Sequence, residues 1–392
     1  MLRLIFCLLL TTSAYANDTT AHSFESFLAD IRTQAISQGI STTTLDQVFY
    51  GLTPNPKVIK FDRSQAEFSQ NFWRYLGSRV SPYRLKNGKK LLQKHQATFQ
   101  HNYQKYGVPP HIIVAFWGLE TNYGSNTGNL NLVRSLATLS FDERRSAFFT
   151  TQLLALLKLI DDNKIPSDAQ GSWAGAMGNV QFMPTNVAAY GVDADGNGEI
   201  GLWDNKADIF ASAANFLQKI GWHRGERWGR EVTIPLNFEY QLANLSTKKT
   251  VNEWQALGVR TATDEDLPDS TMKASLVLPM GYNGPAFLAY RNFHAILRWN
   301  RSILYALSVG HLSDRLAGTS ALVAKPITEP SLSRDDIKFI QTSLNHLGFD
   351  AGEPDGISGP KTRGATRQYQ RDNNLPIDGY VGYQLLQQLQ AL

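Results

Sequence analysis

The chain has 392 residues, 42% of them hydrophobic and 18% charged, a composition that excludes a disordered or fibrous protein. Its length allows roughly two or three domains with a substantial core. The formal net charge of +4 is too small to indicate nucleic-acid binding, and the 11% of aromatic residues suits a protein that stacks on flat ligands such as sugars.

The N-terminus has the pattern of a signal peptide. Arg3 precedes the apolar run Leu4–Leu10, and an A-x-A motif ends at Ala16. The run is too short to span a bilayer, so we expect export with cleavage after residues 1–16 and no stable membrane insertion. The only cysteine, Cys7, lies inside the apolar run and not at its end, which argues against a lipoprotein and leaves the mature chain without a thiol.

The next three hundred or so residues show mainly helical periodicity. Pro109-Pro110 breaks the chain and begins a helix, and the glycine-rich segment Gly171–Pro184 opens another. Short β-like runs at 232–236 and 274–279 flank an inserted small α+β unit at 240–272. The other segments expected to be helical are 23–60, one or two long helices within 65–107, 130–139, 147–160, 209–220 and a closing helix over 292–316.

The composition changes after residue 317, where a segment rich in Pro, Ser and Thr begins. This segment, 318–333, is typical of a linker, and residues 334–392 form a separate small unit. The predicted order is therefore a first domain over 23–317, the linker and the C-terminal unit. The helices expected in that unit are 335–347, 361–373 and a short one from Tyr383.

One carboxylate has unusual neighbours. Glu120 follows the apolar run Ile112–Trp117 and precedes Thr, Asn, Tyr and Gly residues. Desolvation on such a surface is expected to raise the pKa of the carboxyl, as a proton donor for glycosidic-bond cleavage requires. The alternative is a cap or a salt bridge at a helix end. Other acidic pairs, Asp142-Glu143 and Asp161-Asp162, lie in polar surroundings and are expected to be solvated.

Three separated motifs in this order resemble the lytic murein transglycosylase B family, over roughly residues 23–317. Residues 334–392 separately resemble a three-helix peptidoglycan-binding domain. The motifs of the first resemblance are Trp117–Gly124, Gly171–Pro184 and Arg298–Ala306. Those of the second include Leu347-Gly348-Phe349, Asp355-Gly356 and Leu375–Gly379.

The resemblance implies a mainly α (α+β) protein, with a lysozyme-like catalytic domain that carries a small β-containing insertion and a three-helix C-terminal module. It implies a periplasmic peptidoglycan lytic transglycosylase, a lyase that cleaves the MurNAc-GlcNAc β-1,4 bond and forms 1,6-anhydro-MurNAc ends. Glu120 would then be the sole acid and base, because the substrate's own 6-hydroxyl attacks the anomeric carbon. This agrees with the lack of a second insulated carboxylate, which ordinary glycosidases need.

The resemblance also gives roles near Glu120 to residues of the other motifs. Ser172 is expected to hydrogen-bond Glu120, although from the residues alone a helix N-cap explains it equally well. Gln181 is expected to contact the N-acetyl group of the substrate or the Glu120 region. Asn300 and Tyr305, five residues apart on one expected helix, are expected near the bound saccharide.

Aromatic residues add to the expected substrate site. Tyr75 matches a groove-lining tyrosine of the family, although taken alone it is better explained as core. Tyr123 follows the Glu120 motif and is a further candidate to line the groove. Trp299 stands where many family members have Tyr, a change that keeps ring stacking and loses a hydroxyl contact.

Residues 193–208 follow the pattern of a calcium-binding loop, with oxygen-bearing side chains at loop positions one, three and five and glycine at six. Position twelve is Asp204 instead of Glu, and Asp208 is the nearest candidate for the later aspartate that closes this loop in the family. The loop predicts a structural Ca²⁺, with an ion-free polar loop as the alternative, and no organic cofactor is expected. The candidate ligands are Asp193, Asp195, Asn197, Glu199, Asp204 and Asp208.

The expected partners are peptidoglycan glycan strands, with other cell-wall enzymes as further candidates, and the protein is expected to be a monomer without nucleic acid. Two alternative functions stay open. A hydrolytic muramidase would leave reducing ends, and a peptidoglycan-binding scaffold would cleave nothing. In the C-terminal unit, Arg363 and Arg367 share a helix face, where they would meet carboxylates of the peptide stem or simply be solvated.

Overall fold

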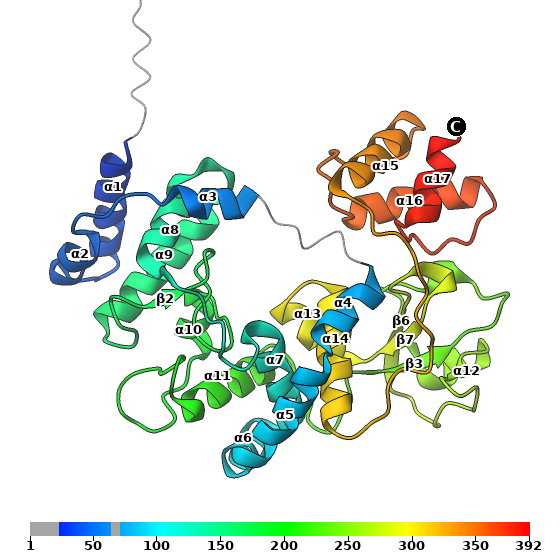
Figure 1. The fold of residues 1–392 in the computed structure, drawn as a ribbon, viewed down its shortest axis with the longest axis horizontal. Helices are drawn as coiled ribbons and strands as arrows, with labels where there is room; N and C mark the ends of the chain where they lie inside the picture. The colour runs from blue at the N-terminus through cyan, green and yellow to red at the C-terminus, as the bar shows by residue number, and fades with distance from the viewer. Residues whose placement is uncertain (1–22, 64–70) are drawn as a thin grey trace, which may run out of the picture.

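The computed structural model describes residues 23–63 and 71–392 (Figure 1). The expected signal peptide with Cys7, and the start of the helical stretch expected from residue 65, lie outside the described residues. Within the described ranges, no helix has both the length and the apolar character that crossing a bilayer needs.

Helices dominate the described chain, and the strands are short, which confirms the predicted mainly α class with a small β-containing insertion. The helices before the linker are α1 (Phe24–Ser37), α2 (Thr42–Phe49), α3 (Pro56–Arg63), α4 (Phe72–Arg79), α5 (Pro82–Lys94), α6 (Gln96–Tyr106), α7 (Pro110–Thr121), α8 (Leu132–Phe141), α9 (Ser146–Asp161), α10 (Pro184–Tyr190), α11 (Lys206–Lys219), α12 (Val251–Ala256), α13 (Arg291–Trp299) and α14 (Ile303–Leu316). The strands are β1 (Leu130–Asn131), β2 (Gln170–Gly171), β3 (Gly229–Thr233), β4 (Lys249–Thr250), β5 (Arg260–Thr261), β6 (Lys273–Val277) and β7 (Ala286–Ala289). The C-terminal helices are α15 (Arg334–His346), α16 (Pro360–Asp372) and α17 (Tyr383–Gln390).

The N-terminal helices α1–α3 pack on the hairpin that α8 and α9 form (Figure 1). Ser41 caps α2, and its neighbour on α9 is Asp161, which accepts hydrogen bonds from Ser41 N (3.1 Å) and from the Thr44 hydroxyl (2.8 Å). These bonds lower the pKa of Asp161, with the Ser41 and Thr44 hydroxyls as the main causes. Asp161 therefore joins α2 to α9 by hydrogen bonds, in addition to the solvent contact that the sequence suggested.

Two helical segments are divided where the sequence suggests continuity. The described part of the 65–107 stretch contains three helices, because Ser81 caps α5, Pro82 begins it and the chain turns again at His95. The expected closing helix over 292–316 is two helices, α13 and α14. Asn300 breaks it with an extended backbone, and Ser302 then caps α14 by accepting the N–H of Tyr305.

The insertion contains a five-stranded antiparallel sheet in the order β4-β6-β7-β3-β5. It has a hydrophobic core of its own, in which Trp254, Leu276 and Tyr290 are fully buried. The predicted inserted α+β unit is confirmed, and β6 confirms most of the β-like run at 274–279, whereas β3 covers only the first two residues of the run at 232–236. The central helix α7 belongs instead to the large core, where it packs against α14 and α5 (Figure 1).

The segment after α14 has no helix or strand between residues 318 and 332, but it is fastened to the first domain. The carboxylate of Glu231 accepts the N–H groups of Val323 (2.8 Å) and Ala324 (2.7 Å). Further along, Glu329 accepts the Tyr380 hydroxyl (2.7 Å) and the N–H of Tyr383 (2.8 Å). These bonds hold the segment along both the sheet and the C-terminal module.

The C-terminal module, residues 334–392, contains the three predicted helices around a small core, and one hydrogen-bonding unit occurs in it twice. Gln341 donates to Asp355 (2.9 Å) and accepts the N–H of the following glycine (2.9 Å). In the same way, Gln370 donates to Asp378 (2.7 Å) and accepts the N–H of Gly379 (2.8 Å). The second unit also contacts the first domain, because the other oxygen of Asp378 accepts the N–H of Tyr282 (2.8 Å).

Candidate active site

Glu120 lies in the last turn of α7, a helix that is buried on every side. Residues 112–119 are all buried, because α7 passes through the centre of the large core. The helix ends where Asn122 and Tyr123 adopt left-handed φ angles of 51° and 64°. Glu120 is half-buried, so its carboxylate ends an apolar helix at the edge of the core.

Two donors from the C-terminal helices of the first domain bind the same oxygen of Glu120. The indole Nε1 of Trp299, at the end of α13, donates to Oε1 at 2.9 Å. The hydroxyl of Tyr305, in the first turn of α14, donates to the same Oε1. Both donors stabilise negative charge on Oε1, so a proton carried by Glu120 is favoured on the other oxygen, Oε2.

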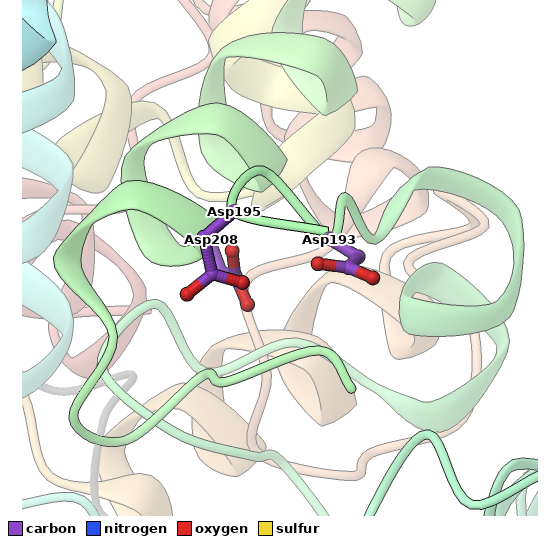
Figure 2. A group of neighbouring side chains, drawn as sticks. All are labelled: Asp193, Asp195 and Asp208. Atoms are coloured by element: carbon purple, nitrogen blue, oxygen red, sulfur yellow. The ribbon is translucent and has the colours of Figure 1, made fainter. Parts of the chain in front are cut away.

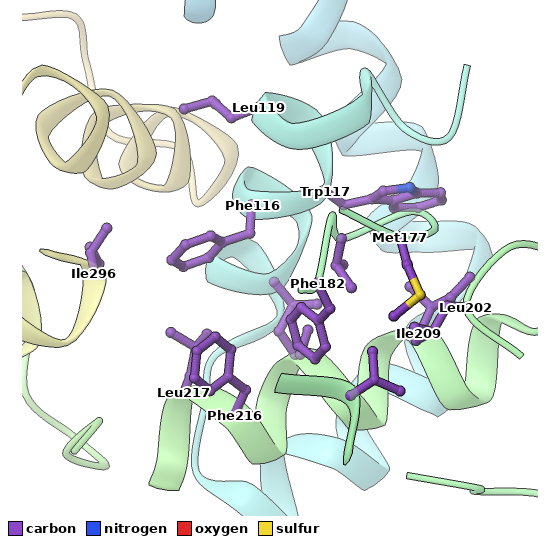
Figure 3. Packing of buried hydrophobic residues seen from close by; sticks show 14 of the residues in the cluster. Phe116, Trp117, Leu119, Met177, Phe182, Leu202, Ile209, Phe216, Leu217 and Ile296 are labelled. Atoms are coloured by element: carbon purple, nitrogen blue, oxygen red, sulfur yellow. The ribbon is translucent and has the colours of Figure 1, made fainter. Parts of the chain in front are cut away.

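The sequence suggested stacking for Trp299 and did not predict its hydrogen bond to Glu120. The indole packs against Phe116 with ring centroids 4.2 Å apart and against Phe216 at 5.0 Å, in tilted geometry with interplanar angles of 34° and 35°. Phe182 meets it edge-on at 5.3 Å. Figure 3 shows these three phenylalanines within the core between α7 and α11. Trp299 is therefore held rigidly, and its N–H is aimed at Glu120 by packing.

The environment of Tyr305 keeps its hydroxyl protonated. Burial first, and then the charge of Glu120 and the hydrogen bond to it, raise the pKa of Tyr305 well above its ordinary value. Arg79 acts in the opposite direction, and Tyr75 adds to the rise. The guanidinium of Arg79 lies 5.0 Å from the ring centroid of Tyr75, so α4 supplies a cation and an aromatic ring beside this pair. The structure thus brings Tyr75 into the surroundings of Glu120, and Arg79 is a neighbour that the sequence did not predict.

A second missed residue, Asn179, joins the Glu120 motif to the glycine-rich motif. Its side-chain oxygen accepts the indole N–H of Trp117 (2.7 Å), and its backbone oxygen accepts the hydroxyl of Thr121 (2.7 Å). Its amide nitrogen donates to Leu202 O (3.1 Å). Asn179 is 2% exposed, and a buried amide with all its polar atoms bonded is a positioning element.

Ser172 and Gln181 hold the glycine-rich segment in shape. The hydroxyl of Ser172 accepts the N–H of Ala176 (2.9 Å) within a turn, and because the next helix, α10, begins only at Pro184, Ser172 is not the helix N-cap that the residues alone suggested. The amide nitrogen of Gln181, a residue with a left-handed φ of 51°, donates to Thr127 O (3.1 Å) and Gly178 O (3.0 Å). The expected contacts of Ser172 with Glu120, and of Gln181 with substrate, stay predictions.

Asn300 and Tyr123 are placed differently from what the sequence suggests. Asn300 is exposed in the turn between α13 and α14, where its side chain accepts the N–H of Ser302 (3.0 Å), so it does not share a helix with Tyr305. The hydroxyl of Tyr123 donates to Arg84 O (2.7 Å), and its ring packs edge-on against Trp117. Burial raises the pKa of Tyr123. Its observed contacts are those of a packing residue, and a role for either residue in substrate binding stays a prediction.

The calcium-type loop brings three of its six candidate ligands together (Figure 2). Carboxylate oxygens of Asp193, Asp195 and Asp208 all lie within 4.8 Å of one another. Asp208 is fully buried, and its two oxygens accept the N–H groups of Ala194 (2.8 Å) and Gly201 (2.8 Å). The backbone N–H groups of the loop, above all Gly198, lower the pKa of Asp193, so it stays charged.

This donor set fits Ca²⁺. Three carboxylates at such separation repel one another unless a cation lies between them, and hard oxygen ligands suit calcium. Gly198, at loop position six, has the positive φ (97°) that a tight calcium loop requires. Among the described residues, neither Asp204 nor Glu199 joins the carboxylate cluster, and Asn197 is not a carboxylate, although its side chain accepts the N–H of Glu199 (2.8 Å). Asp208, and not Asp204, closes the loop in this structure.

Comparison with known proteins adds a family and several relatives. Residues 23–314 match the family model of the transglycosylase SLT domain, and residues 333–389 match that of a putative peptidoglycan binding domain. The chain is 32% identical over 251 residues to membrane-bound lytic murein transglycosylase B of Escherichia coli (strain K12), covering 62% of this chain and 67% of the relative.

Two solved structures are also similar. One is SltB3 from Pseudomonas aeruginosa in complex with NAG-anhNAM-pentapeptide, with 42% identity, a TM-score of 0.90, and coverage of 94% of this chain and 99% of that one. The other is the Escherichia coli lytic transglycosylase Slt35 in complex with calcium, with 29% identity, a TM-score of 0.63, and coverage of 75% and 92%. These likenesses confirm the lysozyme-like architecture expected from the sequence.

Proposed function

This chain belongs to the transglycosylase SLT domain family, and on that premise we propose that Glu120 is the sole acid and base of the peptidoglycan-cleaving reaction. The chain is an enzyme homologous to lytic transglycosylases, which are peptidoglycan-cleaving lyases. The observation that carries the proposal is the half-buried Glu120 carboxyl, which accepts Trp299 and Tyr305 on one oxygen. The substrate is the β-1,4 bond between MurNAc and GlcNAc in the glycan strand.

The first step breaks the glycosidic bond. Glu120, protonated on Oε2, gives its proton to the bridging oxygen as that oxygen leaves with GlcNAc, and positive charge develops at the anomeric carbon of MurNAc. The carboxylate that forms is stabilised by its two donors, Trp299 Nε1 and Tyr305 OH. Both donors are in place before reaction, so no side chain has to move to meet the new charge.

The second step closes a ring and needs no water. The 6-hydroxyl of the same MurNAc attacks its anomeric carbon, and its proton passes to the Glu120 carboxylate. The product ends in 1,6-anhydro-MurNAc, and Glu120 is again protonated. Bound NAG-anhNAM-pentapeptide in a 42% identical structure supports this product class for the present chain. Around this reaction we propose substrate contacts for Ser172, Gln181, Asn300, Tyr75 and Tyr123.

The other parts of the chain fit the same polymer. We propose that residues 23–317 form the catalytic domain and that residues 334–392, after the linker 318–333, hold the enzyme on the wall. Export to the periplasm by the signal peptide 1–16 supplies access to peptidoglycan. The mature protein would begin at Asn17, which N-terminal sequencing of the exported protein checks.

We also propose a structural Ca²⁺ in the 193–208 loop. Asp193, Asp195 and Asp208 would hold it, and a relative solved with calcium supports this assignment. When bound, the ion supplies charge neutralisation to three close carboxylates. In the chain itself, Asp208 ties the loop to α11 through Ala194 and Gly201, so the loop stays folded against the helix.

Replacing Glu120 by glutamine tests the function. The change keeps the shape of the side chain and removes the transferable proton, so wall lysis is expected to fall by about a thousandfold. The control is Glu143→Gln, an exposed carboxylate in the short 3-10 turn after α8, which is expected to keep wild-type activity. Digestion of purified sacculi followed by mass spectrometry of the fragments measures both rate and product.

The same experiment separates the alternatives. A lytic transglycosylase releases anhydro ends, which are lighter by one water than reducing ends. Reducing ends alone would identify a hydrolytic muramidase and overturn the proposed second step. A wild-type protein that binds sacculi and releases no fragments would be a scaffold. If the Glu120→Gln variant still lyses the wall, Glu120 is not the catalytic acid and base.

A further inference from the structure

Two arginines of the C-terminal module are partly buried and have no acidic partner. Arg363 and Arg367 lie four residues apart on α16, so their side chains share one face of the helix. Lys361 of the same helix is exposed and pairs with Asp350 at 3.4 Å. Across the part of the chain that the structure describes, neither arginine forms an ion pair. The exposed Lys361 thus has an acidic partner, whereas the two partly buried arginines have none among the described residues.

The position of Arg367 is built into the module. Its side chain lies over Gly379, where a Cβ would come within 2.7 Å of Cζ and 2.9 Å of Nε. Gly379 also has a φ of 69°, a left-handed value that favours glycine. The Nε of Arg367 is buried and has no hydrogen-bond partner. The glycine therefore leaves space for a guanidinium whose hydrogen-bonding capacity is not used within the protein.

The nearest acidic group is already committed elsewhere. Asp378 attracts Arg367 electrostatically, but its Oδ1 accepts Gln370 Nε2 (2.7 Å) and Tyr380 N (2.8 Å). Its Oδ2 accepts the N–H of Tyr282 across the domain contact (2.8 Å). Asp378 thus holds the second Gln–Asp–Gly unit and the docking of the module, and it does not pair with the arginine.

Burial acts against the charge of both arginines, and the two like charges also act against each other at Arg363. Burial lowers the pKa of Arg363 and of Arg367, and the charge of Arg367 lowers that of Arg363 further. Arg363 makes a hydrogen bond to Ser358 O (2.6 Å), a neutral acceptor. Partly desolvated like charges without a counter-ion destabilise a fold, so the folded module gains nothing from placing both here.

We propose that Arg363 and Arg367 form a binding site for a carboxylate of the peptidoglycan peptide stem. Two guanidinium groups on one helix face offer parallel N–H donors, and a peptide chain end is a carboxylate that such donors bind in pairs. The site would give the module specificity for the peptide part of the polymer. The proposal rests on the proposed function in one respect, namely that the polymer is peptidoglycan.

Binding to sacculi of the full-length chain tests the site. The chain carries Glu120→Gln so that the wall stays intact, and the fraction that sediments with sacculi is measured at increasing NaCl. Two kinds of sacculi are compared, untreated ones and ones whose peptide carboxylates have been converted to amides. We expect amidation to weaken binding by about tenfold or more, as loss of charge-assisted hydrogen bonds predicts. This comparison of sacculi tests the site without any substitution in the C-terminal module.

The double variant Arg363→Gln/Arg367→Gln is expected to bind untreated sacculi as weakly as the parent binds amidated ones. The matched control, Lys338→Gln/Lys361→Gln, removes the same charge from exposed positions and is expected to retain parental binding. Because unpaired cations are removed, the melting temperature of the arginine variant is expected to stay level or rise.

Several outcomes would overturn the site. Equal binding to both kinds of sacculi would show that the module does not recognise a peptide carboxylate. Equal losses of binding in the arginine and lysine variants would show that only the overall positive charge of the module matters. A melting temperature that falls together with binding would make the arginines structural. Anhydro-product release by the wild-type enzyme is measured separately, so a failed arginine site leaves the proposed transglycosylase function intact.

Discussion

Glu120 and Asp208 are both carboxylates at helix ends that accept hydrogen bonds from two donors among the described residues, but these donors come from different distances along the chain. The donors to Glu120 are side chains 179 and 185 residues away, on α13 and α14. The donors to Asp208 are backbone N–H groups 14 and 7 residues away, in the loop before its own helix. The first site is assembled by tertiary packing, and the second largely by local turns.

The two sites therefore depend on different parts of the fold. The Glu120 site requires that α7, α13 and α14 pack correctly, and its donors are aimed by aromatic contacts such as Trp299 on Phe116. The Asp208 site requires one loop to close. Loss of a partner is therefore expected to affect mainly catalysis at Glu120 and mainly stability at Asp208, and the following variants test that division.

The largest effect on stability is expected for Asp208→Ala. It leaves the N–H groups of Ala194 and Gly201 without acceptors, which is expected to lower the free energy of unfolding by about 3 kcal/mol. Urea unfolding measures this, with and without added Ca²⁺. Calcium is expected to stabilise the wild type and not the variant.

Asp204→Ala is the matched control for that loop. Its side chain is exposed and lies outside the carboxylate cluster, so the change is expected to stay within about 0.5 kcal/mol and to keep the calcium effect. If calcium stabilises the Asp208 variant and fails to stabilise the Asp204 variant, the assignment of the closing ligand is wrong.

Tyr305→Phe is expected to act on catalysis and little on folding. Removing a donor to a charged carboxylate costs about 1.5–3 kcal/mol of stabilisation, so kcat is expected to fall roughly 10- to 100-fold with a small change in KM. The charged form of Glu120 loses a donor, so the pH above which activity declines is expected to move upward. Trp299→Phe keeps ring packing, removes the other donor and should shift the profile in the same direction.

Tyr83→Phe is the control for the tyrosine change, because this tyrosine of α5 is 59% exposed. It should leave both kcat and the pH profile as in the wild type. A Tyr305 variant with reduced melting temperature and an unshifted pH profile would show that the hydroxyl supports packing only.

A pH-dependent effect is expected at Asp314, which lies on the same helix as Tyr305 and accepts a hydrogen bond from a distant residue, Trp228 Nε1, at 3.0 Å. Burial raises the pKa of Asp314 to about 6, partly offset by Arg227 and that bond. Because the folded pKa is above the unfolded one, the contribution to stability is fully present below about pH 4 and is lost as pH rises through about 6.

Asp314→Asn therefore is expected to be more stable than the wild type by about 2–3 kcal/mol at pH 7 to 8, with the difference vanishing near pH 4. Urea unfolding between these pH values measures the difference. A constant difference across the range would show that the carboxyl does not titrate as its burial predicts. Wall lysis should be unaffected at pH 7. This result would show that Asp314, at the C-terminal end of α14, affects stability, whereas Tyr305, at the N-terminal end, affects catalysis.

Much of the fold was predictable because its signals are local. Pro110 begins α7, Pro184 begins α10, and the glycine-rich turns lie where the motifs predict them. The break at Asn300 was missed because its cause is a side chain that bonds two residues ahead, which interrupts no apolar periodicity. The fastening of the linker by Glu231 was missed because its partners lie more than ninety residues away.

The same distinction separates the predicted from the missed site residues. Glu120 could be identified from its own apolar surroundings, whereas nothing near Trp299 or Asn179 in the sequence indicates what they bond. Asp208 was a weaker candidate than Asp204 by loop spacing, yet the structure closes the loop with it. Burial at the start of α11 decides this, since spacing alone cannot distinguish an exposed aspartate from a buried one.

By itself, the sequence determined the helical class, the second module and the carboxylate on which the proposed chemistry rests, because periodicity, turn residues and an isolated charge are properties of neighbours along the chain. Tertiary packing sets which oxygen of Glu120 is held, that a tryptophan and a tyrosine hold it, and that two arginines of the module form no ion pair with any described residue. Those facts depend on side chains that meet only when distant helices pack, and burial then sets the cost of every charge left between them.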